Sequence, residues 1–222
     1  MLYVIRLVFV FLFSWPAMAI DIGPMTVVME PSQSFVSRTV TNNSTAPKIY
    51  EIRANKISNP TANGQQLDMK RGELLYSPKR FVLHSKQVQN VKFYYRGDVD
   101  DHERYYQVIF TESPTAQTDE SEKNIRRGAL EIKLELQSIL VVRPRKMQFN
   151  YQLDKGSSAI KNTGNTFFEF MVKDGCEQPD GKADSKYLLP GDIYHNVKVS
   201  ESGNQKVIVF QSRFIPVGND CW

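Results

Sequence analysis

The sequence of 222 residues predicts an all-β protein built from β-sandwiches. Two observations support this fold class: short runs with apolar–polar alternation recur along the chain, and turn-forming residues separate them. A third is that no long stretch has the 3.6-residue periodicity of an amphipathic helix. Many short strands at this spacing are typical of β-sandwiches.

The first 19 residues have the pattern of a secretory signal peptide. Arg6 precedes an apolar run at residues 7–15, and Ala17-Met18-Ala19 resembles a cleavage site. The run is too short for a membrane-spanning helix, and no later stretch approaches the required length. We therefore predict that the mature chain, from Ile20, is exported and has no stable membrane insertion.

The predicted strands follow in order after the signal peptide. In several of them every second residue is apolar, so one face is expected to lie on a core. The faces assigned to a core are Tyr50/Ile52/Ala54, Val91/Phe93/Tyr95, Tyr106/Val108/Phe110 and Phe168/Phe170/Val172. The runs cover residues 25–29, 35–41, 48–57, 88–95, 105–111, 128–142, 166–173 and 206–214.

The run at residues 128–142 contains a segment of strict alternation. Residues 129–136 read A-L-E-I-K-L-E-L, so one strand face carries large aliphatic side chains and the other carries charges. We call the aliphatic face the ridge; it consists of Leu130, Ile132, Leu134 and Leu136. The ridge either covers the core of its own domain or is offered to another molecule, and alternation alone does not separate these readings.

A domain boundary is predicted where this long strand ends. Pro144 cannot donate a hydrogen bond to a neighbouring strand, and the apolar pattern restarts at Met147. We therefore assign one domain to residues 20–143 and a smaller one to residues 147–222. In an exported chain, Cys176 and Cys221 are expected to form a disulfide, which stabilises by roughly 4 kcal/mol in the chain-entropy model.

The sequence gives no support for catalysis, a cofactor or a metal site. His84, His102 and His195 are isolated, no nucleophile–base arrangement or phosphate-binding loop is visible, and Asp98, Asp100 and Asp101 read as a polar turn. The net charge of +4 is scattered, unlike the basic patch of a nucleic-acid-binding protein. An enzyme and a nucleic-acid partner are both disfavoured.

Several segments are specific in combination, through their order and spacing. They are Ser77-Pro78, Phe81-Val82-Leu83 and Gln89-Asn90-Val91-Lys92-Phe93; the D-x-E-x-x-Y-x-x-x-x-x-E-x-P pattern of residues 101–114; the ridge strand ending in Arg143-Pro144; and residues 161–165 and 187–191. Over nearly the whole mature chain they resemble the PapD-like periplasmic chaperones of chaperone–usher pili, and the details resemble the alternate branch of common-pilus and CFA/I-type fimbriae.

This resemblance implies two immunoglobulin-like domains in a boomerang-like arrangement and a location in the periplasm. It also implies a function: the chaperone lends the ridge strand to a pilus subunit that lacks its last strand, and then delivers the subunit to an outer-membrane usher. Such donor-strand complementation is a form of β-strand addition. A subunit-free ridge is expected to invite self-association.

The residues that anchor the subunit differ from the PapD type, which uses an arginine on the first strand and a lysine on the donor strand. Here residues 20–37 contain no basic residue, and Ile139 takes the lysine position. The candidates for binding the subunit's carboxylate are Arg38, Arg143 and Arg145, because the arginine fork suits a carboxylate. For Arg143 the resemblance also implies a structural salt bridge with Glu103.

The main alternative function is a structural pilin or adhesin of the same type of system. A pilin is expected to carry an alternating N-terminal extension, whereas Asp21-Ile22-Gly23-Pro24 leads directly into a strand. An exported carbohydrate-binding sandwich is a third reading. It is expected to present aromatic residues on a loop face, whereas Tyr94, Tyr95, Tyr105 and Tyr106 lie in predicted strands.

Overall fold

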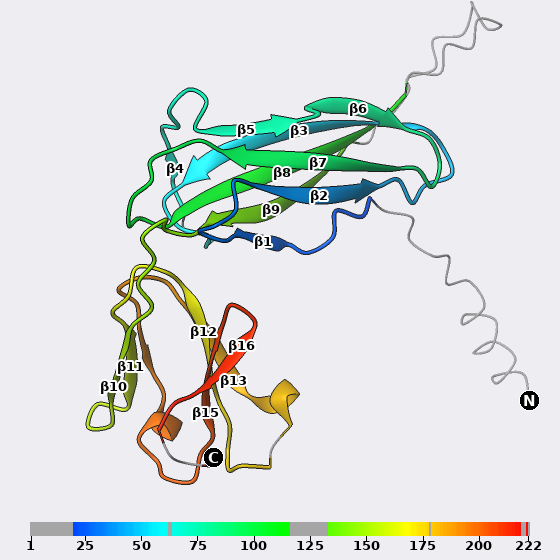
Figure 1. Ribbon diagram of the computed structural model, residues 1–222. Coiled ribbons are helices and arrows are strands. Elements are labelled where there is room, and N and C mark those ends of the chain that lie inside the picture. Colours follow the sequence, from blue (N-terminus) through cyan, green and yellow to red (C-terminus); the bar gives the residue numbers. More distant parts are fainter. Residues whose placement is uncertain (1–19, 62–63, 116–132, 178, 219–220, 222) are drawn as a thin grey trace, which may run out of the picture.

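The computed structural model describes residues 20–61, 64–115, 133–177, 179–218 and 221. Its strands form two β-sandwiches that meet at one end and diverge, so the molecule has the predicted boomerang-like shape (Figure 1). The prediction of an all-β fold with two immunoglobulin-like domains is confirmed. The predicted signal peptide and the ridge residues Leu130 and Ile132 lie outside the described residues.

The larger sandwich packs a six-stranded sheet against a three-stranded one. The first sheet has the order β1-β9-β8-β3-β4, with β6 also paired to β3, and the second has the order β2-β7-β5. The strands are β1 (Thr26–Met29), β2 (Phe35–Thr41), β3 (Lys48–Ile57), β4 (Gln66–Leu67), β5 (Leu74–Ser77), β6 (Arg80–Leu83), β7 (Val88–Tyr95), β8 (Arg104–Pro114) and β9 (Leu134–Val142).

The cores contain the faces predicted from alternation. All twelve side chains assigned to the four apolar faces have exposed fractions of 8% or less. Three of these faces meet between the sheets of the larger sandwich, and the face on β12 (Phe168–Val172) lies in the smaller one. Burial of these aliphatic and aromatic groups is the main favourable contribution to folding.

The smaller sandwich has two sheets, with the orders β10-β11-β14 and β13-β12-β15-β16. Besides β12, its strands are β10 (Tyr151–Asp154), β11 (Ala159–Asn162), β13 (Asp184–Leu188), β14 (Ile193–His195), β15 (Lys206–Phe210) and β16 (Arg213–Pro216). Its 3₁₀ helices are η1 (Asp180–Lys182) and η2 (Val197–Val199). No helix in the described part of the chain is long and apolar enough to cross a membrane.

One predicted strand is wrong in its extent. The run at residues 206–214 is two antiparallel strands, β15 and β16, joined by a tight turn. Gln211 and Ser212 form this turn with positive φ angles of 48° and 60°. Because neither is glycine, asparagine or aspartate, the usual sequence signal for such a turn is absent.

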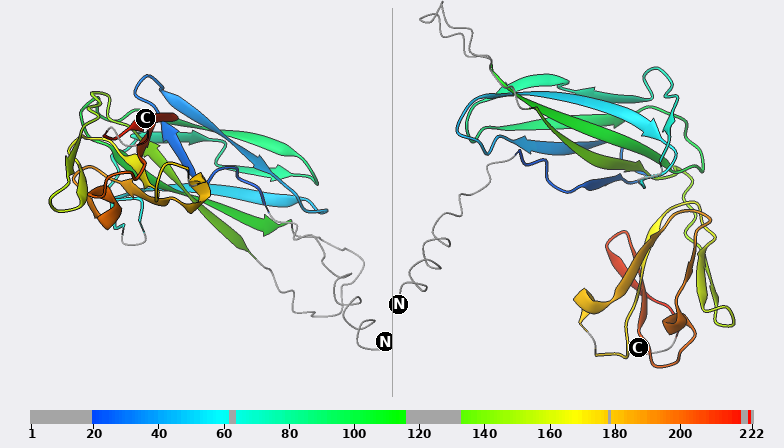
Figure 2. Two further views of the ribbon diagram at one scale, coloured as in Figure 1. Left: turned by 90° about the horizontal axis from the view of Figure 1, so that it is seen from below. Right: turned by 180° about the vertical axis from the view of Figure 1, so that it is seen from behind.

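Strand pairing keeps the two sandwiches separate. In the described residues, β1–β9 pair with one another and β10–β16 pair with one another. This supports a boundary near residues 143–147, which remains a prediction. In the larger sandwich, β1 and β9 lie on the side that faces the angle between the domains (Figures 1 and 2).

Candidate functional site

β9 has an unpaired edge over the first half of its length. On one side β8 pairs with it from Leu134 to Val142, but on the other side β1 pairs with it, in parallel, only from Ile139. Within the described residues, Leu134–Ser138 therefore has no strand neighbour on the β1 side. The pairing with β1 begins where the Ile139 N–H donates to the Met25 carbonyl, at 2.8 Å. An unpaired sheet edge is a template for another strand.

The described part of the ridge lies where β9 emerges from the core. Leu140 and Val142, further along the same face, are 3% and 1% exposed. Leu136 is partly buried against that core, whereas Leu134 is 37% exposed. One strand face therefore passes from the protein's own core to solvent, and the exposed leucine lies on the part of β9 whose edge is unpaired.

Arg38 is a buried cation without an anionic partner among the described residues. It lies on β2 between Val36 and Val40, and only 5% of its surface is exposed. Its Nη2 donates a 2.8 Å hydrogen bond to the Ile22 carbonyl, whereas its Nε has no partner. Burial lowers the pKa of Arg38, but a guanidinium keeps its charge at neutral pH. An anion placed beside it would compensate a charge that is costly to bury alone.

A small cavity lies between β1, β2 and β9, beside the end of the unpaired edge. Its volume is about 10 Å³, which is the size of one water molecule. Arg38 and Ser138 are its polar lining residues, and the others are Val27, Val36, Phe93, Val108, Ile139 and Leu140. Ser138, the last residue of β9 without a neighbour on the β1 side, therefore lines the same cavity as the buried guanidinium.

Arg143 contacts residues of both domains, and its guanidinium does not line an open site. Its side chain is 4% exposed, and its Nε lies 3.2 Å from Glu30 Oε1. Its Nη1 donates to the Thr166 hydroxyl and, at 3.1 Å, to the Phe167 carbonyl. The same nitrogen lies 3.7 Å from Glu103 Oε2. All of its nitrogen contacts are therefore made within the protein.

Glu103 is the acidic centre of this interdomain cluster. Its carboxylate accepts hydrogen bonds from the hydroxyls of Tyr105 and Thr166, both at 2.6 Å, and from the Phe167 N–H at 3.1 Å. Burial raises the pKa of Glu103, and these hydrogen bonds together with Arg143 offset the rise only in part. Arg143 and Glu103, the pair that the resemblance implies, thus lie within ion-pair distance, and the structural role of this pair stays a prediction.

The Arg145 guanidinium also makes its contacts within the protein. Its Nη1 donates to the carbonyls of Glu30 and Pro31, at 2.8 and 2.7 Å, and its guanidinium lies 5.3 Å from the centre of the Tyr95 ring. Of the three candidate arginines, Arg38 is the one with a buried N–H that lacks a partner. The contacts of Arg143 and Arg145 therefore lie within the protein, whereas Arg38 keeps a donor without a partner.

Sequence reasoning did not identify Ser138 or β1 as parts of this site. Ser138 is a small polar residue within an apolar alternation, a signal that the sequence does contain. The pairing of Thr26 with Ile139 joins distant segments, and local periodicity carries no information about such a partner.

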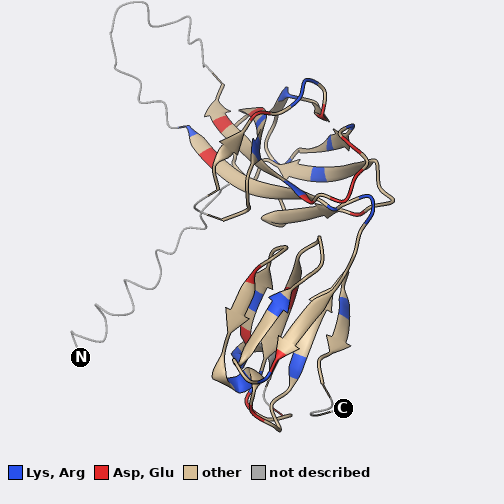
Figure 3. Cartoon of the chain, turned by 90° about the vertical axis from the view of Figure 1, so that its left-hand side faces the viewer, with Lys and Arg blue, Asp and Glu red and all other residues tan. Residues whose placement is uncertain are grey.

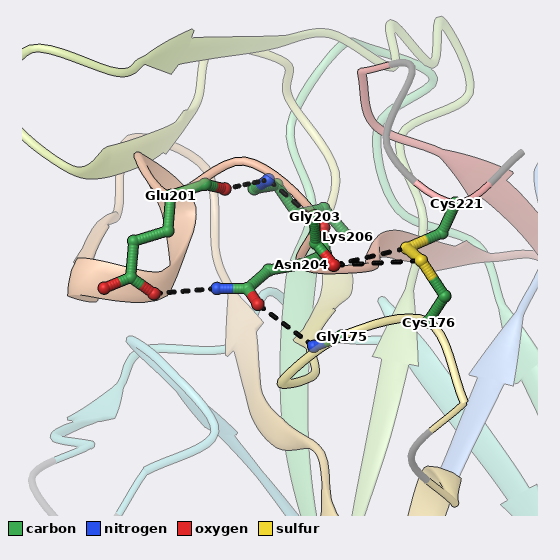
Figure 4. Close-up of a disulfide and its surroundings, with 7 residues drawn as sticks. All are labelled: Gly175, Cys176, Glu201, Gly203, Asn204, Lys206 and Cys221. Carbon is green, nitrogen blue, oxygen red and sulfur yellow. Dashed lines mark hydrogen bonds between the residues drawn. A yellow bond between two sulfur atoms is a disulfide. The ribbon is translucent and has the colours of Figure 1, made fainter.

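The two cysteines form the predicted disulfide far from this site, at the C-terminal end of the smaller sandwich (Figure 4). Both sulfur atoms lie near the Gly203 carbonyl oxygen, at 3.7 and 3.5 Å. Asn204 accepts a hydrogen bond from the Gly175 N–H at 3.0 Å and donates to Glu201 at 2.8 Å. The disulfide thus joins the chain end to a hydrogen-bonded pair of loops.

Charged residues of both signs are interspersed over both sandwiches (Figure 3). On the outer face of the six-stranded sheet, Arg53 pairs with Glu135 at 2.8 Å and Gln107 donates to Gln137 at 2.9 Å. In the described part of the chain, no group of three or more His, Cys, Asp or Glu side chains could hold a metal ion.

Comparison with known proteins relates this geometry to one family. Residues 19–148 match the family described as pili and flagellar-assembly chaperone, PapD N-terminal domain. The probable fimbrial chaperone EcpE of Escherichia coli K12 is 34% identical over 203 residues, which cover 91% of this chain and 86% of EcpE. The probable fimbrial chaperone EcpB of E. coli K12 / DH10B is 31% identical over 209 residues, 91% of this chain and 92% of EcpB.

Solved structures show the same fold. The class 5 fimbriae chaperone CfaA matches 90% of this chain and 93% of its own chain with a TM-score of 0.55, at 14% identity. The CsuC–CsuE chaperone–tip adhesion subunit complex of Acinetobacter baumannii provides a match with a TM-score of 0.53 and 14% identity, covering 90% of this chain and 97% of the matched chain. The curated relatives are described as probable fimbrial chaperones, and this chain, as a member of the chaperone family, is not an enzyme.

Proposed function

Since the chain belongs to the PapD family of pilus chaperones, we propose that it works in the periplasm by donor-strand complementation and delivers its subunits to an outer-membrane usher. The observation that carries the proposal is the unpaired edge of β9, which ends beside the buried Arg38, whose Nε has no hydrogen-bond partner. A subunit strand pairs with this edge, and the ridge fills the groove left by the subunit's missing strand.

The ridge supplies the apolar part of the interaction. Burial of a large aliphatic side chain is worth roughly 1.5–3 kcal/mol, so four fully exposed ridge residues would supply on the order of 6–12 kcal/mol before the cost of association, and Leu136 supplies less than its share because it is already partly buried. Among the described ridge residues, Leu134 is the one whose side chain can be buried by a subunit, because it is exposed and not packed into the core of the larger sandwich. Alternation fixes the register, since a slip of one residue turns Glu135 into the groove.

Arg38 supplies the anchor for the subunit's terminal carboxylate. A strand that runs parallel to β9 along Leu134–Ser138 ends at the start of β1, so its C-terminus arrives beside the cavity of Arg38 and Ser138. The unpaired Nε of Arg38 and the Ser138 hydroxyl are the available donors. Because the cavity has the volume of only about one water molecule, entry of a carboxylate moves β1 away from β2.

The ridge is tested by co-expression of the chaperone with a candidate pilus subunit. Leu134→Glu is expected to abolish co-purification of the subunit, while Leu75→Glu, which changes a leucine of similar exposure on β5, leaves it intact. Both variants are expected to fold, because the two side chains are 37% and 41% exposed. Equal recovery of the subunit with both variants contradicts the proposal.

The anchor is tested with a synthetic peptide of the subunit's final strand, prepared with a free or an amidated C-terminus. A charge-assisted hydrogen bond is worth about 1.5–3 kcal/mol, so the free acid is expected to bind roughly 10- to 100-fold more tightly than the amide. Arg38→Met removes this difference, while Arg71→Met, in the exposed turn before β5, retains it. An acid–amide difference that survives in Arg38→Met excludes Arg38 as the anchor.

A further inference from the structure

The smaller sandwich presents an apolar sheet face that its own core does not use. In the sheet β13-β12-β15-β16, Tyr187 pairs with Glu169, Glu169 with Val209, and Val209 with Phe214. Cross-strand partners share a face, and this is the face opposite Phe168 and Phe170 of the core. The next row on the same face consists of Ser185, Met171, Val207 and Pro216.

The row that runs from Tyr187 to Phe214 has a large, solvent-exposed side chain at each end. Tyr187 is 60% exposed and Phe214 is 64% exposed. Glu169 is the single charged residue of the two rows, and it lies between the aromatic ends. Exposed aromatic residues at the ends of an apolar row are typical of surfaces that bind a protein partner.

This sheet face borders the angle between the domains. A cleft of about 600 Å³ is lined by Ser185 and Tyr187 of β13 and, from the larger sandwich, by Thr26, Val28, Ile139 and Val141 on β1 and β9. At the opposite edge of the sheet, Gln211, in the turn before β16, donates a 2.6 Å hydrogen bond to Glu30 at the end of β1. The edge strands β13 and β16 therefore both lie close to the β1 side of the larger sandwich (Figures 1 and 2).

We propose that the Tyr187–Phe214 face is a second docking surface for the same subunit that β9 holds; this inference rests on the proposed function. A strand added at the free edge of β9 lies in line with β1, so the further strands of the subunit extend the six-stranded sheet beyond β1, which is its terminal strand. The body of the subunit then lies over the cleft, opposite β13 and β16. The surface is thus continuous with the β9 edge through Ile139 and Val28. It suits an apolar subunit patch, because its single charged residue, Glu169, already has a hydrogen bond with the Tyr187 side chain.

The test separates the body of the subunit from its final strand. The complex recovered by co-expression is mixed with excess fluorescent wild-type chaperone, and the rate at which the subunit exchanges is measured. Phe214→Ser, and separately Tyr187→Ser, are expected to accelerate exchange at least 10-fold. Neither is expected to change the affinity for the synthetic peptide of the subunit's final strand, because the peptide reaches only β9 and Arg38.

Val197→Ser is the matched control. Val197 is 69% exposed, but it lies in η2, outside the proposed surface. Its exchange rate and peptide affinity are expected to equal those of the wild type. Thermal unfolding verifies that all three variants are folded, as expected from the exposure of the changed side chains.

The outcomes are distinguishable. If wild-type protein binds neither peptide nor subunit, the proposed function fails. If wild-type protein holds the subunit and Phe214→Ser and Tyr187→Ser exchange it at the wild-type rate, the second surface is excluded and the proposed function stands. If sedimentation of subunit-free protein shows a dimer that Phe214→Ser dissociates, with exchange unchanged, the face binds a second copy of the chain and the proposal is overturned.

Discussion

Two buried glutamates of the larger sandwich respond to their surroundings in opposite ways. Burial raises the pKa of Glu73, but hydrogen bonds from Lys56, from the Tyr106 hydroxyl and from the Lys70 N–H outweigh it and leave the pKa below its ordinary value. For Glu103, burial outweighs the hydrogen bonds and Arg143, so the pKa is raised. The balance between desolvation and specific partners therefore decides the sign at each residue.

Glu103→Gln is expected to change how stability depends on pH. Because the folded-state pKa of Glu103 lies above its unfolded value, the wild type is relatively more stable below the unfolded pKa and loses stability as the pH rises through the folded pKa. The loss is at most about 1.4 kcal/mol per pH unit between the two values. The variant is expected to lack this loss when denaturant unfolding is followed from about pH 4 to pH 8.

Glu73→Gln is the matched comparison, since the lowered pKa of Glu73 has the opposite sign. Its contribution is present above the unfolded pKa and is lost as the pH falls through the folded pKa. The variant is therefore expected to be less stable at neutral pH and to lose less stability in acid. A Glu103→Gln variant with the wild-type pH dependence above about pH 4 would contradict the assignment for Glu103.

At the scale of elements, β9 combines a core strand and an exposed edge. Leu136→Glu is expected to lower the free energy of unfolding by about 2–3 kcal/mol, because it places a charge against the core of the larger sandwich. Leu134→Glu is expected to cost less than about 1 kcal/mol, since that side chain is already exposed. Denaturant titration of the two variants compares these values, and equal losses would show that Leu134 is also a core residue.

The sequence predicts the strands well and their partners poorly. Alternation identified the buried faces of β3, β7, β8 and β12, because burial on one face imposes a period of two. The sequence identifies Arg38 as a candidate anchor without assigning its strand face to a core, and neither its burial between Val36 and Val40 nor the absence of a counter-ion could be inferred from local patterns. The edge left open by the short β1 depends on a contact between distant segments, so local patterns do not encode it.

The disulfide is the element-scale constraint of the smaller sandwich. It joins Cys176, after β12, to Cys221, beyond β16, over a sequence separation of 45 residues. Cys176→Ser with Cys221→Ser is expected to destabilise this domain by about 4 kcal/mol in the chain-entropy model. Calorimetry of the wild type with and without reductant is expected to show a lower unfolding temperature when the bond is reduced, and an unchanged profile would show that the bond contributes little.

At the scale of the whole molecule, one buried cluster holds the angle between the domains. Arg143 contacts Glu30 and Glu103 of the larger sandwich and Thr166 and Phe167 of the smaller one. Its guanidinium also lies 4.9 Å from the centre of the Phe210 ring. Since both proposed binding surfaces face this angle, the cluster sets their relative position.

Arg143→Ala is expected to cost about 3–5 kcal/mol, because it leaves Glu103 buried without its cation. We also expect separate unfolding transitions for the two domains and a broader distribution of shapes in small-angle X-ray scattering. Gln211→Ala, which removes one exposed interdomain hydrogen bond, is the control and is expected to cost no more than about 1 kcal/mol. A single transition at the wild-type temperature in Arg143→Ala would contradict this role.

The short first strand, β1, also fixes where a bound subunit strand must end. β1 occupies the edge of β9 from Ile139 onward, so in the proposed complex an added strand must stop at Ser138. The last residue of every bound subunit is therefore fixed at Ser138, whereas the number of residues that precede it in the subunit is not constrained. It follows that a peptide tag fused to the C-terminus of a subunit would prevent capture, whereas the same tag at the N-terminus would be accepted.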